Sequence, residues 1–207
     1  MDLQNLRRAI EIVRRHTPPP GSRAATYLRT YPALLSIARQ SEGDDRTKFL
    51  QLATVAYGWM PRIVRLDPAH LDSAIEAFTG AQAATGVSWN EVSVDHVAAC
   101  LHSVVGASKL LHFANPEVFP IWDRNVERIW RGTDPSQHHM DQPRHYVSYA
   151  GRVHELRRAA AFHAFFDEFS RAYKERLDRL EITGYPLTQI RAAEAAAFEL
   201  AGDENDA

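Results

Sequence analysis

The stretch of the sequence with the most capacity for chemistry is HSVVGASKLLHFANPEVFPIWDRNVERIW, residues 102–130. Its pattern predicts a helix, a turn at Gly106, a short helix over residues 107–114, an extended piece containing FPIW, and a new helix after Asp123. A short two-helix unit of this kind exposes backbone N–H groups at a helix N-terminus, where a phosphate can bind without any side-chain charge. The segment therefore predicts a site that could hold the backbone of a nucleic acid.

The same residues resemble a known family. The segment is similar to the hairpin and active-site signature of the helix-hairpin-helix DNA glycosylases, in particular their 8-oxoguanine glycosylase-like branch. The matching residues are Gly106 at the turn, Lys109, His112 with Phe113, and Asp123 at the start of Asp-Arg-Asn-Val. The chain departs from the family pattern in having one glycine in VVGAS where two are usual. The interval between its lysine and its aspartate is also about one helical turn shorter than in the family pattern.

The resemblance implies a DNA glycosylase that uses no cofactor and acts on double-stranded DNA carrying a damaged or modified base. Lys109 would be the amine that attacks the sugar C1′ and forms a Schiff base. Asp123 would assist proton transfer or stabilise the oxocarbenium-like sugar. The flipped base would stack in a pocket, with Trp122 as the first candidate for its wall and Trp59 as the second. The other residues expected to contact DNA are Gly106, Ser108, His112, Arg124 and Asn125.

The resemblance leaves the reaction and the substrate open. If Lys109 reacts, the enzyme also cleaves the strand as an AP lyase; otherwise Asp123 activates water and the enzyme is monofunctional. The substrate is either an oxidised purine in repair or a hypermodified cytosine of phage DNA, which would imply antiviral defence. Two alternatives involve no catalysis: a helical module that binds DNA or a partner protein through the hairpin, and a helical interaction protein with no role on DNA.

The charged candidates also have purely structural interpretations. Asp123 suits the N-cap of a helix, a role that contributes about 1 kcal/mol, although the surrounding FPIWDRNV exceeds what a cap requires. Lys109 suits the solvated face of a short helix. Arg124 can bind a phosphate or pair with Glu117 or Glu127.

The histidines are expected to be structural. His112 suits a core or hydrogen-bonded position. Four further candidate metal ligands follow in the polar stretch after residue 130: His138, His139, Asp141 and His145. Adjacent histidines on a loop rarely close a tetrahedral site, and the sequence has no HExxH pair, so no metal site is expected.

Helix signals dominate the rest of the chain. The predicted helices span residues 2–16, 23–40, 46–57, 67–84, 93–105, 107–114, 146–180 and 188–202, with one more from Asp123 and a polar loop over 131–145. Asp67, Ser93 and Thr188 are the expected N-caps. The prediction is an all-α single domain, residues 1–207, in two helical lobes with a cleft between them. Segment 93–131 would hold the hairpin and active site, with the N- and C-terminal helices packed around it.

Composition and charge argue against several classes of protein. The formal net charge is −2, which argues against a protein that coats nucleic acid by bulk electrostatics, although a local basic face remains open. Cys100 is the single cysteine, so an intramolecular disulfide is excluded. The first residues lack the apolar core of a signal peptide, and no stretch is apolar enough to span a membrane. We expect a soluble, cytoplasmic protein, acting as a monomer.

Overall fold

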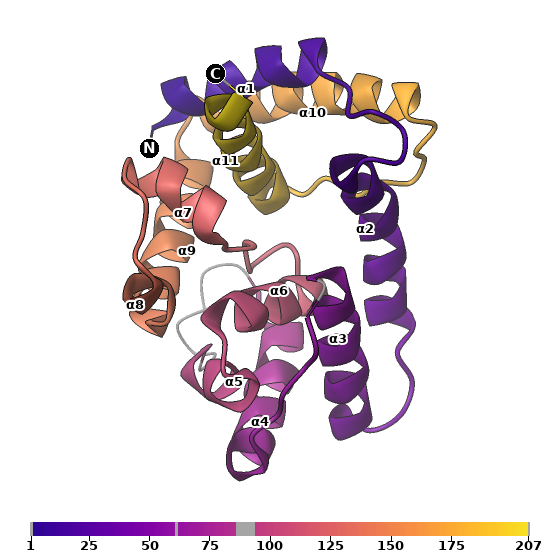
Figure 1. Cartoon of the computed structure of the whole chain (residues 1–207), viewed down its shortest axis with the longest axis vertical. Coiled ribbons are helices and arrows are strands. Elements are labelled where there is room, and N and C mark those ends of the chain that lie inside the picture. The colour runs from indigo at the N-terminus through magenta and orange to yellow at the C-terminus, as the bar shows by residue number, and fades with distance from the viewer. Residues whose placement is uncertain (1, 61, 86–93, 207) are drawn as a thin grey trace. The chain divides into compact units, whose positions relative to one another are not determined.

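The computed structural model describes residues 2–60, 62–85 and 94–206, with side chains described as far as residue 202. Across these ranges the chain forms eleven α-helices and one short 3-10 helix, and it contains no strand (Figure 1). The all-α prediction is therefore confirmed. No helix in the described part of the chain is both long enough and apolar enough to cross a membrane.

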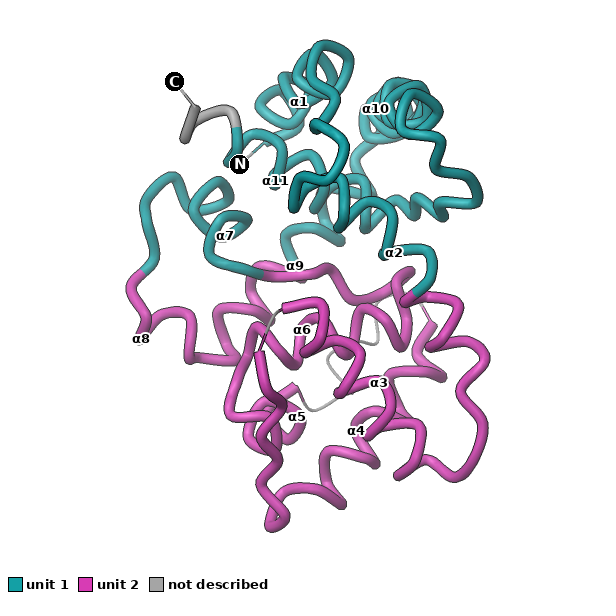
Figure 2. Tube along the Cα trace, turned by 45° about the vertical axis from the view of Figure 1, so that its right-hand side comes forward, with its two compact units in different colours: residues 1–33, 123–135, 151–207 teal, residues 34–122, 136–150 magenta. Residues whose placement is uncertain are grey.

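The chain divides into two compact units, and neither is continuous in sequence (Figure 2). Unit 1 contains residues 1–33, 123–135 and 151–207, and unit 2 contains residues 34–122 and 136–150. Two helices, α2 (Arg23–Gln40) and α9 (Pro143–Arg158), have residues in both units. The predicted active-site segment is also divided, because the boundary falls between Trp122 and Asp123.

Unit 1 is built around a packed group of helices. These are α1 (Leu3–Arg15), α7 (Arg124–Arg131), α10 (Phe162–Arg179) and α11 (Gln189–Asp206). Helix α1 packs against α10 and α11, and α7 packs against α11 (Figure 1). The apolar stripe of α1, including Leu6, Ile10 and Val13, is buried, as the spacing of these residues predicts. Asp2 caps this helix by accepting a hydrogen bond from the Asn5 N–H.

The core of unit 1 contains an aromatic row along α10. Phe162, Phe165, Phe169 and Tyr173 follow one another at helical spacing, with ring centroids 5.4–5.5 Å apart between successive members. All four are buried. Phe162, Phe165, Phe169 and Tyr173 therefore form part of the hydrophobic core of this unit.

Unit 2 is built around α6, which packs against three neighbouring helices. The helices of this unit are α3 (Asp45–Trp59), the 3-10 helix η1 (Pro68–His70), α4 (Leu71–Ala83), α5 (Val94–Leu101), α6 (Val104–Ala114) and α8 (Gln137–Met140). Leu110, Leu111 and Phe113 of α6 are buried against α3, α4 and α5. Asp67 caps η1 as predicted, accepting from the Ala69 N–H. The expected cap Ser93 lies outside the described residues.

The turn between α5 and α6 differs from the one that the sequence predicts. The helices are interrupted at His102 and Ser103, and Gly106 lies inside α6. His102 adopts a left-handed φ of 48°, a conformation that glycine usually supplies. Ser103 then caps α6 by accepting from the Gly106 N–H at 2.9 Å. The prediction of a glycine turn at Gly106 is therefore wrong, because a serine cap starts the helix earlier.

Three other boundaries differ from the prediction. The polar loop over 131–145 contains α8, which Ser136 caps through the His139 N–H, and its last residues already belong to α9. The helix predicted over 146–180 is two helices, since the chain turns between Arg158 and Phe162. The last helix begins after its predicted cap Thr188 but continues to Asp206 instead of ending at Gly202.

Candidate functional site

Asp123 lies at the N-terminus of α7 in unit 1. Its backbone is extended, with φ −143° and ψ 178°, and its carboxylate Oδ1 accepts a hydrogen bond from the Val126 N–H at 2.9 Å. The predicted N-cap is confirmed. The side chain is half-buried. Because a carboxylate has two oxygens and the cap uses one, this residue combines a fixed orientation with an oxygen that can face a substrate.

Arg124 follows Asp123 and is held by an acid of its own unit. Its Nε and Nη2 donate to the two carboxylate oxygens of Asp134, at 3.0 and 2.7 Å. Gly132, at φ 79°, ends α7 and turns the chain back, which lets Asp134 reach the start of the helix. These bonds lower the pKa of Asp134 and raise that of Arg124. The partner is thus Asp134, whereas the sequence pointed to Glu117 or Glu127.

The first turn of α7 thus presents an anionic cap beside a fixed guanidinium. Asn125 is half-buried in the same turn, and Arg124 is exposed. Phosphate could replace Asp134 as the partner of Arg124, since guanidinium binds both anions through parallel N–H groups. These three neighbouring residues, which the sequence singled out, therefore remain available at the surface of unit 1.

In unit 2 the structure brings Lys109 and Trp59 together. The Lys109 ammonium lies 5.3 Å from the centre of the Trp59 ring, within range of a cation–π interaction. Phe113, one helical turn after Lys109, contacts the same indole edge to face, with ring centroids 5.4 Å apart. Lys109 and Trp59 are both half-buried. We call these three residues the lysine–indole cluster. The sequence singled out each of them, but it did not predict their contact.

Trp122 is fully buried, so the prediction that it forms an accessible wall for a flipped base is wrong for this structure. Its backbone N–H donates to the Ser108 hydroxyl, and its carbonyl accepts from the same hydroxyl, both at 3.1 Å. Ser108 is fully buried as well. A DNA contact predicted for Ser108 is therefore also wrong; the hydroxyl instead fixes the FPIW segment to α6.

His112 and Gly106 are likewise parts of the packed interior. His112 has no exposed surface, and its Nδ1 lies 2.7 Å from the Phe119 carbonyl oxygen. Gly106 is buried against Tyr57, and a Cβ at this position would lie 2.6 Å from the Tyr57 hydroxyl. The predicted DNA contacts of both residues are wrong for this structure. His112 holds the turn after α6, and Gly106 permits the close approach of α3.

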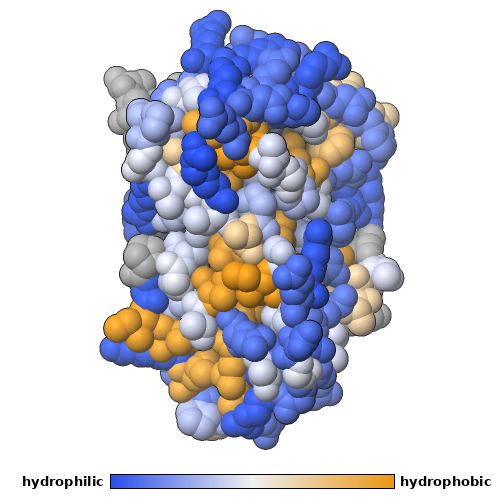
Figure 3. Space-filling view, turned by 90° about the vertical axis from the view of Figure 1, so that its right-hand side faces the viewer, coloured by the Kyte–Doolittle hydropathy of each residue, from blue (hydrophilic) through white to orange (hydrophobic). Residues whose placement is uncertain are grey.

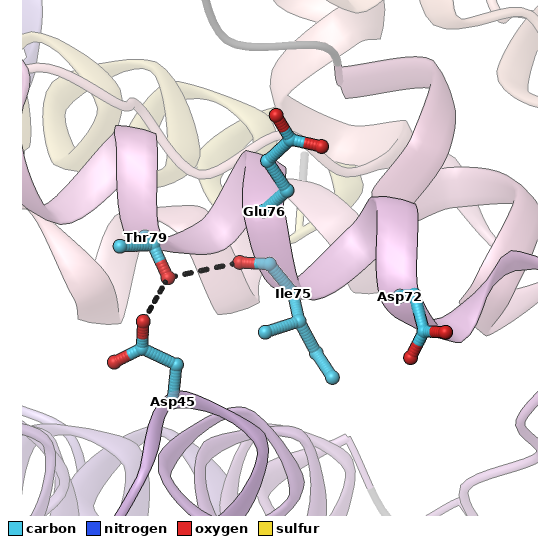
Figure 4. A pocket seen from close by; sticks show the side chains of 5 residues that line it. All are labelled: Asp45, Asp72, Ile75, Glu76 and Thr79. Carbon is cyan, nitrogen blue, oxygen red and sulfur yellow. Dashed lines mark hydrogen bonds between the residues drawn. The ribbon is translucent and has the colours of Figure 1, made fainter.

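Two pockets lie within single units, and neither is lined by Asp123 or Lys109. The pocket of unit 2, about 360 Å³, is lined by three carboxylates, Asp45 of α3 and Asp72 and Glu76 of α4, and Thr79 donates to Asp45 (Figure 4). The pocket of unit 1, about 330 Å³, adjoins α7. Its lining residues are Asn5, Arg8, Arg128, Ile129, Gly132, Thr133, Asp134 and Leu200. The sequence predicts neither pocket, because each joins residues distant in the chain.

The histidine-rich stretch forms a ring stack. His139 of α8 and His145 of α9 lie with ring centroids 3.7 Å apart and nearly parallel. Within the parts of the chain that the structure describes, no three His, Cys, Asp or Glu side chains are grouped so as to hold a metal ion. The residues His138 and Asp141 are exposed and lie outside this stack.

The predicted site residues thus separate into two sets. Asp123, Arg124 and Asn125 belong to unit 1, and the lysine–indole cluster belongs to unit 2. Comparison of the chain with family models, with curated proteins and with solved structures finds no match. The chemistry of these residues is therefore the basis for any functional proposal.

Proposed function

We propose that the protein is a DNA glycosylase in which Asp123 is the catalytic carboxylate. The observation that carries this proposal is the cap geometry: one oxygen of a half-buried carboxylate is held by the Val126 N–H, which leaves the other for a substrate. Cleavage of an N-glycosidic bond generates positive charge on the sugar as the base departs. A carboxylate with a fixed orientation stabilises that charge without reorganising during the reaction.

Lys109 supplies the nucleophile in the bifunctional form of this proposal. Its neutral amine attacks C1′, the C1′–N bond breaks, and the base leaves with a proton; loss of the amine proton and opening of the sugar ring then give the Schiff base. The contact with Trp59 supports this role, since the indole face orients the lysine and offers a surface on which an extruded base can stack. An oxidised purine and a hypermodified cytosine are the two substrates proposed.

Borohydride trapping tests the reaction and the nucleophile together. The chain has three lysines, Lys48, Lys109 and Lys174, so a covalent adduct is readily assigned by peptide mass spectrometry. The substrates are duplexes that carry 8-oxoguanine, phage DNA with hypermodified cytosine, and matched unmodified DNA. We expect an adduct at Lys109 on one modified substrate. It should disappear in Lys109→Gln and persist in the matched variants Lys48→Gln and Lys174→Gln.

The other outcomes of this experiment are also informative. Abasic sites without an adduct would assign a monofunctional reaction, in which Asp123 activates water. Absence of both abasic sites and adducts on every modified duplex would contradict the glycosylase proposal. Equal damage to modified and unmodified phage DNA would contradict the defence role alone.

A non-catalytic binding module is the second candidate function. The observation that favours it is that Trp122, the predicted wall of the base pocket, is fully buried, whereas Arg124, which can bind a phosphate, is exposed. If this alternative holds, Asp123→Asn and Lys109→Ala bind duplex DNA as the wild type does, and no variant produces abasic sites. If the glycosylase proposal holds, Asp123→Asn abolishes base release, and Lys109→Ala does so only in the bifunctional form.

A further inference from the structure

The pocket of unit 1 is a candidate binding site separate from Asp123. Its volume is about 330 Å³, near the lower end of the range typical of small-molecule sites. Three helices of the same unit, α1, α7 and α11, line it together with the turn that follows α7. A small ligand in this pocket therefore contacts groups from four separate parts of the unit.

The lining of this pocket is largely polar. On the face of the molecule that Figure 3 shows, apolar patches interrupt a mostly hydrophilic surface. Most of the residues that line the pocket, in contrast, carry polar or charged side chains: Asn5, Arg8, Arg128, Thr133 and Asp134. The pocket therefore suits a polar ligand better than a purely apolar one.

The charges of the lining favour an anion. Arg8 of α1 is exposed and forms no salt bridge with any residue in the described ranges. Arg128 of α7 is held in place, since its Nη2 donates to the Ala201 carbonyl of α11 at 2.8 Å. Asp134 is the acid among the described lining residues, and both of its oxygens accept from Arg124, which does not line the pocket. Two guanidinium groups thus line the pocket with one carboxylate that is already paired.

The hydrogen-bonding groups indicate a phosphate ester that also carries hydroxyl groups. Guanidinium binds phosphate through parallel N–H groups, which suits Arg8 and Arg128. The Thr133 hydroxyl accepts from the Arg131 Nε at 3.1 Å, so its own proton remains for donation to a ligand. Each carboxylate oxygen has a second lone pair, and Asp134 can therefore accept from the hydroxyl of a sugar while it binds Arg124.

Two apolar residues complete the lining. Ile129 is 8% exposed and Leu200 is 5% exposed, so each offers a small apolar surface to a ligand. We propose that the pocket binds a nucleoside monophosphate, whose phosphate contacts Arg8 and Arg128. Its ribose hydroxyls contact Asp134, and its base covers Ile129 and Leu200.

The test is calorimetric titration of the full chain with the 5′-monophosphates of adenosine, guanosine, cytidine and uridine. We expect one of them to bind the wild type, and its Kd to rise at least about tenfold in Arg8→Gln, because a charge-assisted contact with the phosphate is lost. Arg7→Gln is the matched control. It removes the same charge from the neighbouring exposed position of α1, which does not line the pocket, and it should bind as the wild type does.

The titration contains no DNA, so its result does not depend on the glycosylase proposal. The free nucleoside and inorganic phosphate should both bind more weakly than the nucleotide. Inorganic phosphate that binds as tightly as the nucleotide would show a site for a bare anion and overturn the inference. Equal losses in Arg7→Gln and Arg8→Gln, or no binding at millimolar concentration, would also overturn it. If the nucleotides fail to bind and Arg8→Gln weakens binding of duplex DNA instead, the pocket holds a backbone phosphate and the inference is wrong.

Discussion

At the scale of single residues, Asp123 has two roles that can be measured separately. Asparagine is nearly as good an N-cap as aspartate, but it lacks the charge. We therefore expect Asp123→Asn to lower the free energy of unfolding by at most about 1 kcal/mol, from the lost interaction with the helix dipole. Asp123→Ala also loses the cap bond and should cost about 1–2 kcal/mol. Both variants should reduce base release by at least about 100-fold.

The control for this prediction is a second aspartate cap. Asp44 caps α3 by accepting from the Thr47 N–H at 2.8 Å, the same hydrogen bond to the third following residue that Asp123 makes. Asp44→Asn should show a similar small change in thermal unfolding and no change in base release. Full activity of Asp123→Asn on a substrate that the wild type cleaves would show that the carboxylate is a cap alone.

The sequence predicted Asp123 well because capping is local. An aspartate followed by a helical pattern satisfies exposed N–H groups whatever the rest of the chain does. Burial is not local: Trp122, the next residue back, has no exposed surface, and Ser108 binds its main chain from a distant helix. The sequence alone identified residues whose side chains could take part in catalysis or binding, but it could not show which of them are buried.

At the scale of the elements, the packing of α3 on α6 depends on the absence of one side chain. A Cβ at Gly106 would lie 2.6 Å from the Tyr57 hydroxyl and 3.0 Å from its ring carbons. Tyr57 has little freedom to move, because its hydroxyl donates to the Leu101 carbonyl at 2.9 Å. We expect Gly106→Ala to lower the free energy of unfolding by about 1–3 kcal/mol, measured by denaturant titration.

Gly80 provides the matched control. It lies inside α4, and a Cβ at this position would meet nothing within 4 Å, so Gly80→Ala should stabilise the protein by about 0.5–1 kcal/mol through its helix propensity. Adding Tyr57→Phe to Gly106→Ala removes the closest atom and should recover part of the loss. A stabilising effect of Gly106→Ala comparable to that of Gly80→Ala would contradict the described contact.

The errors in the predicted helices have specific physical causes. The turn between α5 and α6 contains His102 in a left-handed conformation. The sequence at this turn has no glycine or proline from which a turn could be predicted. Three alanines, residues 159–161, separate α9 from α10, and alanine is the strongest helix former. Tertiary packing therefore overrides local preference at both places. By contrast, the range of α2 was predicted correctly, despite Pro32 within it.

At the scale of the whole molecule, each unit is assembled from separate parts of the chain. Unit 2 needs residues 136–150 as well as 34–122. Tyr146 and Tyr149 of this second part are fully buried, and their hydroxyls donate to the carbonyls of Pro120 and Ile121. A fragment of residues 34–122 lacks both rings and should unfold without a cooperative transition and bind a dye for exposed apolar surface.

A longer fragment, residues 34–150, retains both tyrosines and should unfold cooperatively on heating, as followed by circular dichroism. The pair of fragments therefore isolates the contribution of the 136–150 segment. Cooperative unfolding of the shorter fragment would show that the first part of unit 2 is sufficient on its own.

Helix α1 packs against helices that lie near the other end of the chain, and this has a consequence during translation. The stripe that α1 buries is covered by α10 and α11, which begin at Phe162 and Gln189. A ribosome adding roughly 5–20 residues per second needs on the order of ten seconds to reach them. Through that interval Leu6, Ile10 and Val13 have no native cover, and the nascent chain must rely on chaperones or on its own arginines to avoid aggregation.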